Sequence, residues 1–268
     1  MPPAATLADA LQPLRDDPSR AAILLDIDGT LAPIVRHAED AHVPESTRTA
    51  LIAVARQYAL VACISGRQAA TARSMVAIGT LTYVGAHGVE VLNPGGTQVE
   101  LDREVAAWQD RVQRFADRHD TDELRRLRIR HEDKQAIRAM HWRGVPDEAA
   151  AEAALHDVAA DAERSGLAVH WGRKVLEIRP PVEISKGNGI KRLLRAHDDI
   201  DVALYVGDDR TDVDGFDGLR ELVEQGRLKA AVCVGVMSEE TPQELTAAAD
   251  VLVDGTGGVR GMLEALGA

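Results

Sequence analysis

Short apolar runs alternate with segments of helical periodicity along most of this chain, and this alternation restricts its fold more than any other feature. Outside the middle third, the runs expected to form strands are 21–25, 60–64, 81–84, 89–92, 202–206, 230–234 and 251–253. The segments expected to form helices are 44–58, 68–76, 212–224, 241–249 and 258–266. Strands that are joined through helices pair in parallel, so we predict an α/β domain with a mainly parallel sheet.

The middle of the chain follows another order, in which a pair of strands comes after each helix. Its expected helices are 104–118 and 146–164, and its expected strands are 127–131, 135–141, 169–171 and 174–178. Directly consecutive strands suit hairpins better than parallel crossovers. We therefore predict that residues 103–180 form an inserted α-β-β-α-β-β domain, and that 1–102 and 181–268 form one core. Gly95-Gly96 and Pro180-Pro181 would serve as hinges.

The charge balance limits the partners of this chain. Its 31 basic and 43 acidic side chains give a formal net charge of −12, whereas proteins that bind a nucleic-acid backbone usually present a basic face. No apolar run approaches the roughly 20 residues that span a bilayer, and the N-terminus lacks the pattern of a signal peptide. Cys63 and Cys233 lie in apolar runs, which suits core thiols in a reducing compartment. We expect a cytoplasmic monomer without nucleic-acid or membrane partners.

Two aspartates follow the first expected strand directly, in the segment Asp26-x-Asp28-Gly29-Thr30. Ligands bind beyond the carboxyl ends of strands in open parallel sheets, so this position suits catalysis. Carboxylate oxygens suit Mg²⁺, which also engages substrate phosphate, and a carboxylate can attack phosphorus to form an aspartyl phosphate. The alternative is a simple surface turn after a core strand. We predict a magnesium-dependent phosphatase with Asp26 as its nucleophile.

Further polar segments follow expected strands or open expected helices. Ser65-Gly66-Arg67 follows strand 60–64, where a hydroxyl, a glycine and free amides at a helix start can hold phosphate. The acidic segment 207–212 follows strand 202–206 and could complete a metal site. Lys186 opens another helix and could provide a point charge for phosphate. Because each segment alone also fits a helix N-cap or a solvated lysine, we base the prediction on their convergence.

These segments resemble, in the same order, the four motifs of the haloacid dehalogenase superfamily of phosphatases. The resemblance implies a Rossmann-like core and a covalent mechanism. Asp26 would attack phosphorus, and Asp28 would protonate the leaving oxygen and then activate water. Ser65 and Lys186 would hold the phosphoryl oxygens. The implied magnesium ligands are Asp26, the carbonyl of Asp28 and Asp208, with Asp209 and Asp212 in support.

Within that superfamily, the chain resembles the trehalose-6-phosphate phosphatase family. The matching segments are 65–67, 85–90, 132–134, 177–180, 186–187 and 207–212. Residue 213 is Val where the family usually has Glu, which leaves the three aspartates of that segment in place. The resemblance implies an α/β cap over residues 103–180, which would close for specificity, and hydrolysis of trehalose 6-phosphate in trehalose biosynthesis.

Charged residues of the inserted domain are expected to bind the sugar. Glu132 and Lys134 are two residues apart and would share one face of a strand, as would Glu177 and Arg179. Without the resemblance, salt bridges on a solvated sheet explain these residues as well.

The core is expected to contact the substrate through Gly66, Arg67 and His87.

Two rival functions stay open. One is the same chemistry on another sugar phosphate, such as sucrose or glucosylglycerol phosphate. The other is a non-catalytic sugar-phosphate sensor that retains the fold, against which the presence of every expected catalytic group counts.

Overall fold

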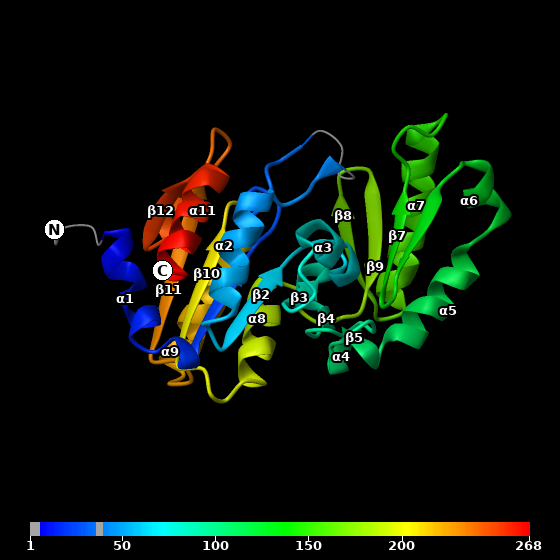
Figure 1. Ribbon diagram of the computed structural model, residues 1–268. Helices are drawn as coiled ribbons and strands as arrows, with labels where there is room; N and C mark the ends of the chain where they lie inside the picture. Colours follow the sequence, from blue (N-terminus) through cyan, green and yellow to red (C-terminus); the bar gives the residue numbers. More distant parts are fainter. Residues whose placement is uncertain (1–5, 36–39) are drawn as a thin grey trace. The chain divides into compact units, whose positions relative to one another are not determined.

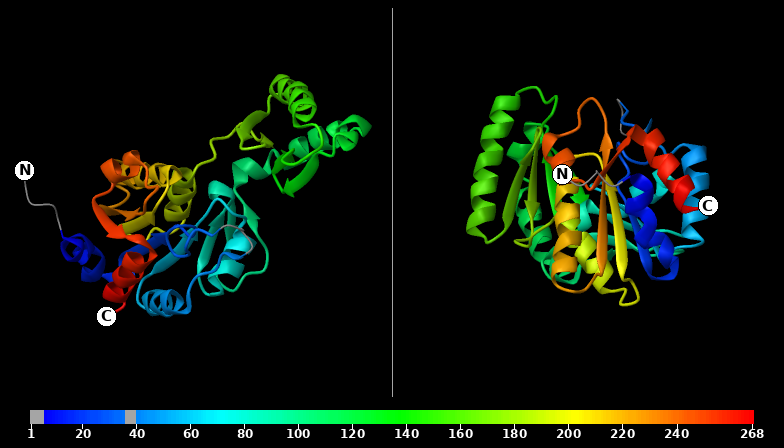
Figure 2. Two further views of the ribbon diagram at one scale, coloured as in Figure 1. Left: turned by 90° about the horizontal axis from the view of Figure 1, so that it is seen from above. Right: turned by 90° about the vertical axis from the view of Figure 1, so that its left-hand side faces the viewer.

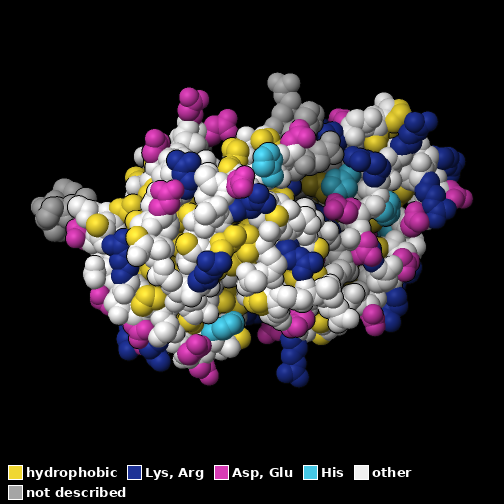
Figure 3. Space-filling view, in the orientation of Figure 1, with side chains coloured by type: hydrophobic (Ala, Val, Ile, Leu, Met, Phe, Trp, Pro, Cys, Tyr) yellow, Lys and Arg dark blue, Asp and Glu magenta, His cyan; other side chains and the backbone are white. Residues whose placement is uncertain are grey.

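The computed structural model describes residues 6–35 and 40–268 of the chain (Figure 1). The chain divides into two compact units: unit 1, Met1–Glu100 with Ile184–Ala268, and unit 2, Leu101–Glu183. On the face that Figure 3 shows, hydrophobic side chains lie in small groups among charged side chains of both signs. Within the described ranges, no helix has both the length and the apolar character that crossing a bilayer requires.

Unit 1 contains a sheet in the order β12-β11-β10-β1-β2-β3-β4-β5. Its strands are β1 (Ala21–Leu25), β2 (Leu60–Ile64), β3 (Thr82–Gly85), β4 (Glu90–Leu92), β5 (Glu100–Leu101), β10 (Val202–Gly207), β11 (Ala230–Met237) and β12 (Val251–Asp254). Every pair from β12 to β3 is parallel, and β3 pairs with β4 in antiparallel fashion. The prediction of an α/β fold with a mainly parallel sheet is confirmed.

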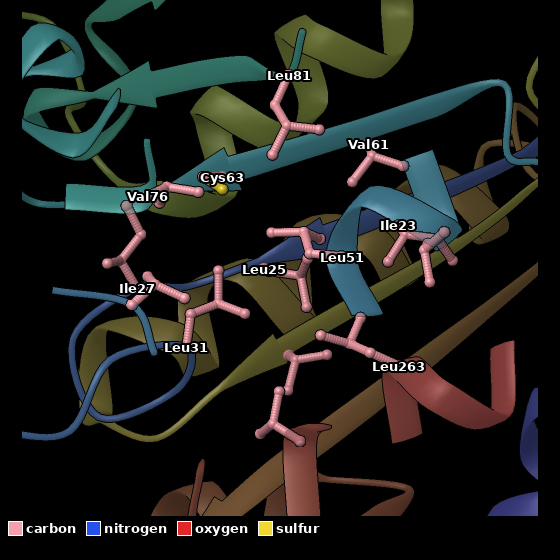
Figure 4. Close-up of a cluster of buried hydrophobic side chains, with 14 of the residues drawn as sticks. Ile23, Leu25, Ile27, Leu31, Leu51, Val61, Cys63, Val76, Leu81 and Leu263 are labelled. Atoms are coloured by element: carbon pink, nitrogen blue, oxygen red, sulfur yellow. The ribbon is translucent and has the colours of Figure 1, made fainter. Parts of the chain in front are cut away.

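Helices cover both faces of the unit 1 sheet (Figure 2). They are α1 (Leu7–Asp16), α2 (Glu45–Ala55), α3 (Ala69–Val76), α8 (Lys186–Arg195), α9 (Arg210–Glu224), α10 (Gln243–Ala248) and α11 (Gly255–Leu266). Successive strand residues point to opposite faces. Ile23 and Leu25 therefore pack against α1, α2, α3 and α11, a cluster that Figure 4 shows in part, while Leu24 packs against α8, α9 and α10.

Both cysteines lie in this core. Cys63 belongs to the cluster under α2 and α11, and Cys233 to the cluster under α8 and α9. Both are free and buried, as expected for core thiols.

Unit 2 contains an antiparallel sheet in the order β6-β7-β9-β8, with one face packed on helices. Its elements are α4 (Arg103–Ala106), α5 (Gln109–His119), α6 (Asp122–Arg126), β6 (Arg130–Lys134), β7 (Ile137–His141), α7 (Glu148–Arg164), β8 (Ala168–Gly172) and β9 (Val175–Arg179). Met140, Leu176 and Ile178 contribute the sheet side of the core, and Phe115 and Leu155 the helix side.

The structure corrects two predicted elements in unit 2. The helix predicted over 104–118 is divided into α4 and α5. The strand predicted over 127–131 is β6, three residues later, because α6 and a left-handed residue at Arg128 (φ 57°) occupy the preceding segment. Leu127 and Ile129 alternate with arginines as in a strand, which is why the sequence pattern is misleading there.

Candidate active site

The carboxyl ends of three neighbouring strands bring the predicted polar segments together in unit 1. Asp26 follows β1, Ser65 follows β2, and Asp208 follows β10. A pocket of about 210 Å³ opens at these strand ends. It is lined by Asp26, Asp28, Gly66, Arg67, His87, Lys186, Asp208, Asp209 and Thr211.

Lys186 lies buried between two aspartates. Ser185 caps α8 by accepting from the Asn188 N–H, which places Lys186 at the first position of the helix. The Lys186 Nζ donates to Oδ1 of Asp26 and to Oδ1 of Asp212, both at 2.6 Å. Burial opposes the charge of Lys186, but the two carboxylates outweigh burial and raise its pKa. Lys186 is therefore a fixed positive charge inside the site.

Three carboxylates of this site fit a divalent cation. Asp26, Asp208 and Asp212 each offer an oxygen within 4.8 Å of the others. Burial raises the pKa of Asp26, and burial together with Asp212 raises the pKa of Asp208 to about 7. Burial is the main cause of both shifts and the neighbouring carboxylates add to it, so a bound cation would favour the ionised form of each. Hard oxygen donors of this kind suit divalent ions such as Mg²⁺, Ca²⁺ and Mn²⁺.

The other two predicted metal residues have their carboxylates engaged elsewhere. Asp209 is the N-cap of α9 and accepts from the Arg210 N–H at 2.6 Å. Asp28 accepts from Nε and Nη2 of Arg67, both at 2.7 Å. The structure thus groups Asp26, Asp208 and Asp212, and leaves only the backbone carbonyl of Asp28 as its predicted contribution.

Residue 29 has to be a glycine because the Asp208 carboxylate lies directly against its backbone. Its φ of +82° is one that side chains rarely adopt, and a Cβ there would lie 1.9 Å from Oδ2 of Asp208. The glycine of the first motif therefore leaves the space that the Asp208 carboxylate occupies.

The loop after β2 is held in place by backbone contacts and a buried glutamate. Ser65 is buried, and its Oγ accepts from the Arg67 N–H at 3.1 Å. The carbonyl of Ser65 accepts from the His87 N–H at 3.1 Å, and the His87 ring lies against Gly66. Glu90 accepts from the Ala69 N–H at 2.7 Å and so anchors the start of α3. The sequence analysis placed Glu90 in the expected strand 89–92 and in a segment that matches the family, but gave it no role, since its partner Ala69 lies 21 positions away in the sequence.

The four predicted sugar residues lie on one face of the unit 2 sheet, opposite the helices. Lys134 donates from Nζ to Oε1 of Glu177 at 2.9 Å, and Arg179 donates from Nε to Oε2 of Glu177 at 2.9 Å. The Lys134 Nζ lies 3.8 Å from Oε2 of Glu132. Burial opposes the charge of Glu177, but Arg179 and Lys134 lower its pKa, so it stays ionised.

Sequence reasoning assigned no role to two histidines on that face. The Nε2 of His141 lies 2.9 Å from Oε2 of Glu132, and His170 pairs across the strands with Glu177. Burial lowers the pKa of His170. Only strand register reveals them, because His170 pairs directly with Glu177, and His141, which pairs with Arg130, lies diagonally from Glu132.

The affinity for Mg²⁺ is expected to depend on pH through Asp208. With a pKa of about 7, Asp208 holds a proton at lower pH that a cation must displace. The apparent affinity should rise at least about tenfold per pH unit up to about pH 7 and less steeply above it, because Asp26, whose pKa is also raised, can release a second proton. Calorimetric titration with Mg²⁺ from about pH 5.5 to about pH 8.5 measures this. An affinity that is flat across that range would contradict the participation of Asp208.

Comparison with known proteins identifies relatives of the chain. Residues 24–250 match the family model described as trehalose-phosphatase. A trehalose-phosphate phosphatase of Mycobacterium marinum is 33% identical over 222 residues, which are 80% of this chain and 56% of that protein. A Mycobacterium tuberculosis protein named as an uncharacterized glycosyl hydrolase is 35% identical over 208 residues, 75% of this chain and 15% of that protein.

A solved structure shows the same fold. Trehalose-6-phosphate phosphatase of Aspergillus fumigatus superposes with a TM-score of 0.65 and 23% identity, and the match covers 99% of this chain and 98% of that one. The matches to eight curated relatives cover between 15% and 64% of the length of those proteins.

Proposed function

Because the chain belongs to the trehalose-phosphatase family, we propose that it hydrolyses trehalose 6-phosphate to trehalose and inorganic phosphate. Unit 1 would be the catalytic core, and unit 2 the α/β cap that binds the sugar. The site residues would have the catalytic, metal-binding and substrate-binding roles that the sequence predicts for them.

One observation carries the proposal: three strand ends and the start of α8 converge on a single pocket. That pocket is lined by a buried carboxylate, Asp26, which would be the nucleophile, by a second carboxylate two residues away, Asp28, and by two cations, Lys186 and Arg67. A phosphoryl group needs this combination, since positive groups offset its charge while a carboxylate attacks phosphorus.

In the first step, an oxygen of Asp26 forms a bond to phosphorus as the bond from phosphorus to the sugar oxygen breaks. Asp28 would take up a proton from solvent once Arg67 leaves it, and would give that proton to the leaving oxygen, so trehalose departs neutral. Arg67 holds both oxygens of Asp28 in the structure, and a phosphate dianion would compete for the same guanidinium. Arrival of the substrate would thus free Asp28 for proton transfer.

In the second step, Asp28 takes a proton from water, and the water oxygen attacks phosphorus and releases the Asp26 carboxylate. Lys186 stays beside Asp26 throughout and offsets the charge of the phosphoryl oxygens. Asp26, Asp208 and the Asp28 carbonyl would hold Mg²⁺, with Asp212 and Asp209 in support. The ion would supply positive charge against the carboxylates and the phosphoryl group.

A panel of sugar phosphates tests the proposal directly. The chain should release phosphate from trehalose 6-phosphate with a kcat/KM at least about tenfold above sucrose 6-phosphate, glucosylglycerol phosphate and glucose 6-phosphate. A chelator should abolish release, and added Mg²⁺ should restore it. A preference for another sugar phosphate would replace the substrate assignment, and binding of the sugar phosphate without turnover would support a sensor.

We also propose that the protein acts as a cytoplasmic monomer. The free, buried thiols Cys63 and Cys233 suit a reducing compartment. A small sugar phosphate also requires no second subunit to be bound, and light scattering of the purified chain would measure its mass in solution.

A further inference from the structure

Tyr205 is a buried tyrosine whose hydroxyl points to the acidic site. It lies in β10, three residues before Asp208, and is 0% exposed. Its hydroxyl donates to Oδ1 of Asp212. A buried hydroxyl that meets a carboxylate makes a stronger contact than one between neutral groups. Sequence reasoning counted this residue as part of an apolar strand and gave it no role.

Asp212 accepts four hydrogen bonds, which fix its carboxylate in position. Oδ1 accepts from Nζ of Lys186 at 2.6 Å and from the hydroxyl of Tyr205. Oδ2 accepts from the backbone N–H groups of Asp208 and Asp209, both at 3.0 Å. One carboxylate therefore connects the site's lysine, Tyr205 and the backbone of the second acidic segment. Any movement of Asp212 would move Lys186 and Asp208 with it.

The Tyr205 ring can reach this position because α9 has a glycine where the ring lies. A Cβ on Gly215 would be 2.2 Å from Cε1 of Tyr205. The next residue, Phe216, packs edge-on against the ring, with centroids 5.9 Å apart and an interplanar angle of 71°. The ring is thus confined on the helix side, and its hydroxyl has a fixed direction.

We propose that Tyr205 is a positioning residue for the magnesium site and for phosphoryl transfer. Its hydroxyl fixes Asp212, and Asp212 fixes both the Lys186 ammonium and the backbone that carries Asp208. Without that hydroxyl, Oδ1 of Asp212 would accept a hydrogen bond only from Lys186, whose long side chain rotates about four bonds. The part that concerns phosphoryl transfer rests on the proposed phosphatase function, whereas the part that concerns the metal ion does not.

Tyr205→Phe tests this because it removes the hydroxyl and keeps the ring between Gly215 and Phe216. We expect Mg²⁺ to bind about tenfold more weakly in calorimetry, as is typical when a group behind a ligand is lost. With saturating Mg²⁺, kcat for trehalose 6-phosphate should fall about tenfold while KM changes by less than about twofold.

Tyr83→Phe is a matched control in the same sheet. Tyr83 is also 0% exposed, and its hydroxyl donates to the backbone carbonyl of Ile78 at 2.6 Å, a contact that involves no residue of the pocket. The control should lower Tm by about 2–4 °C through the lost hydrogen bond and leave Mg²⁺ affinity and kcat unchanged.

Two results would separate failure of this inference from failure of the proposed function. If Tyr205→Phe lowers Tm as the control does but binds Mg²⁺ and turns over like the wild type, Tyr205 is structural only and the inference is wrong. If the wild type releases no phosphate from any sugar phosphate, while Tyr205→Phe still weakens Mg²⁺ binding, the proposed function is wrong and the role at the metal site stands.

Discussion

Replacement of Asp26 by Asn is expected to lower kcat for trehalose 6-phosphate by about 10⁴-fold or more, because an amide cannot form the covalent bond to phosphorus. Asn keeps the size of the side chain and can still accept from Nζ of Lys186, whose other partner, Asp212, remains. Burial raises the pKa of Asp26, so its charge is disfavoured in the cation-free protein. In chelator, the Tm of Asp26→Asn should therefore not fall below that of the wild type.

Phosphate release by Asp26→Asn and wild type, each at saturating Mg²⁺, measures the effect. Asp217→Asn is a suitable control, since Asp217 is an exposed aspartate of α9 outside the pocket lining. It should retain full activity. Acid quench of the wild type during turnover should also trap one phosphoryl group on Asp26, which mass spectrometry can detect. Undiminished phosphate release by Asp26→Asn would contradict the nucleophile assignment.

The sequence predicts β1 and β2 of unit 1 well because each is a short, fully buried apolar run that is followed by a polar residue. Strands 21–25 and 60–64 have the predicted bounds, and the polar residues Asp26 and Ser65 follow them directly. Parallel pairing then places these residues at one edge of the sheet. The sequence alone therefore predicts that the motifs converge on one pocket.

Contacts between distant residues could not be inferred in the same way. The ion pair of Arg67 with Asp28 spans 39 positions of sequence, and no local pattern indicates it. Tyr205 occupies a strand position typical of a core residue, and its polar contact depends on the α9 glycine beside it. The carboxylates of Asp28 and Asp209 lie outside the group formed by Asp26, Asp208 and Asp212, and contact Arg67 and the start of α9 instead, which motif spacing does not show.

Unit 2 was harder to predict because its strands are half exposed. Side chains on the polar face of β6 follow no apolar alternation, whereas Leu127 and Ile129 just before it do. Spacing of two residues still placed Glu132 with Lys134, and Glu177 with Arg179, on common faces. The strand register places both pairs on the same face of the sheet, since Ala139 of β7 pairs with Glu132 on one side and with Glu177 on the other.

Lys134→Ala is expected to lower kcat/KM for trehalose 6-phosphate by about 10–100-fold, the effect of losing one charged hydrogen bond to a sugar hydroxyl. The same change should leave hydrolysis of p-nitrophenyl phosphate, which has no sugar, within about twofold of the wild type. The contrast follows from the position of Lys134 in unit 2, whereas the phosphoryl residues all belong to unit 1. Steady-state kinetics with both substrates at saturating Mg²⁺ measures it.

Lys174→Ala provides the matched control in the same unit. Lys174 lies in the turn between β8 and β9, where its Nζ is 3.2 Å from Oε2 of Glu148, so its ion pair is with Glu148 and not with Glu177. It should change neither substrate, because an exposed ion pair contributes little. Equal losses for both substrates in Lys134→Ala would mean that the lysine supports folding or the chemical step. No loss for either would assign the Lys134 and Glu177 contact to a salt bridge on a solvated sheet, and the residues that select the sugar would then have to be sought elsewhere.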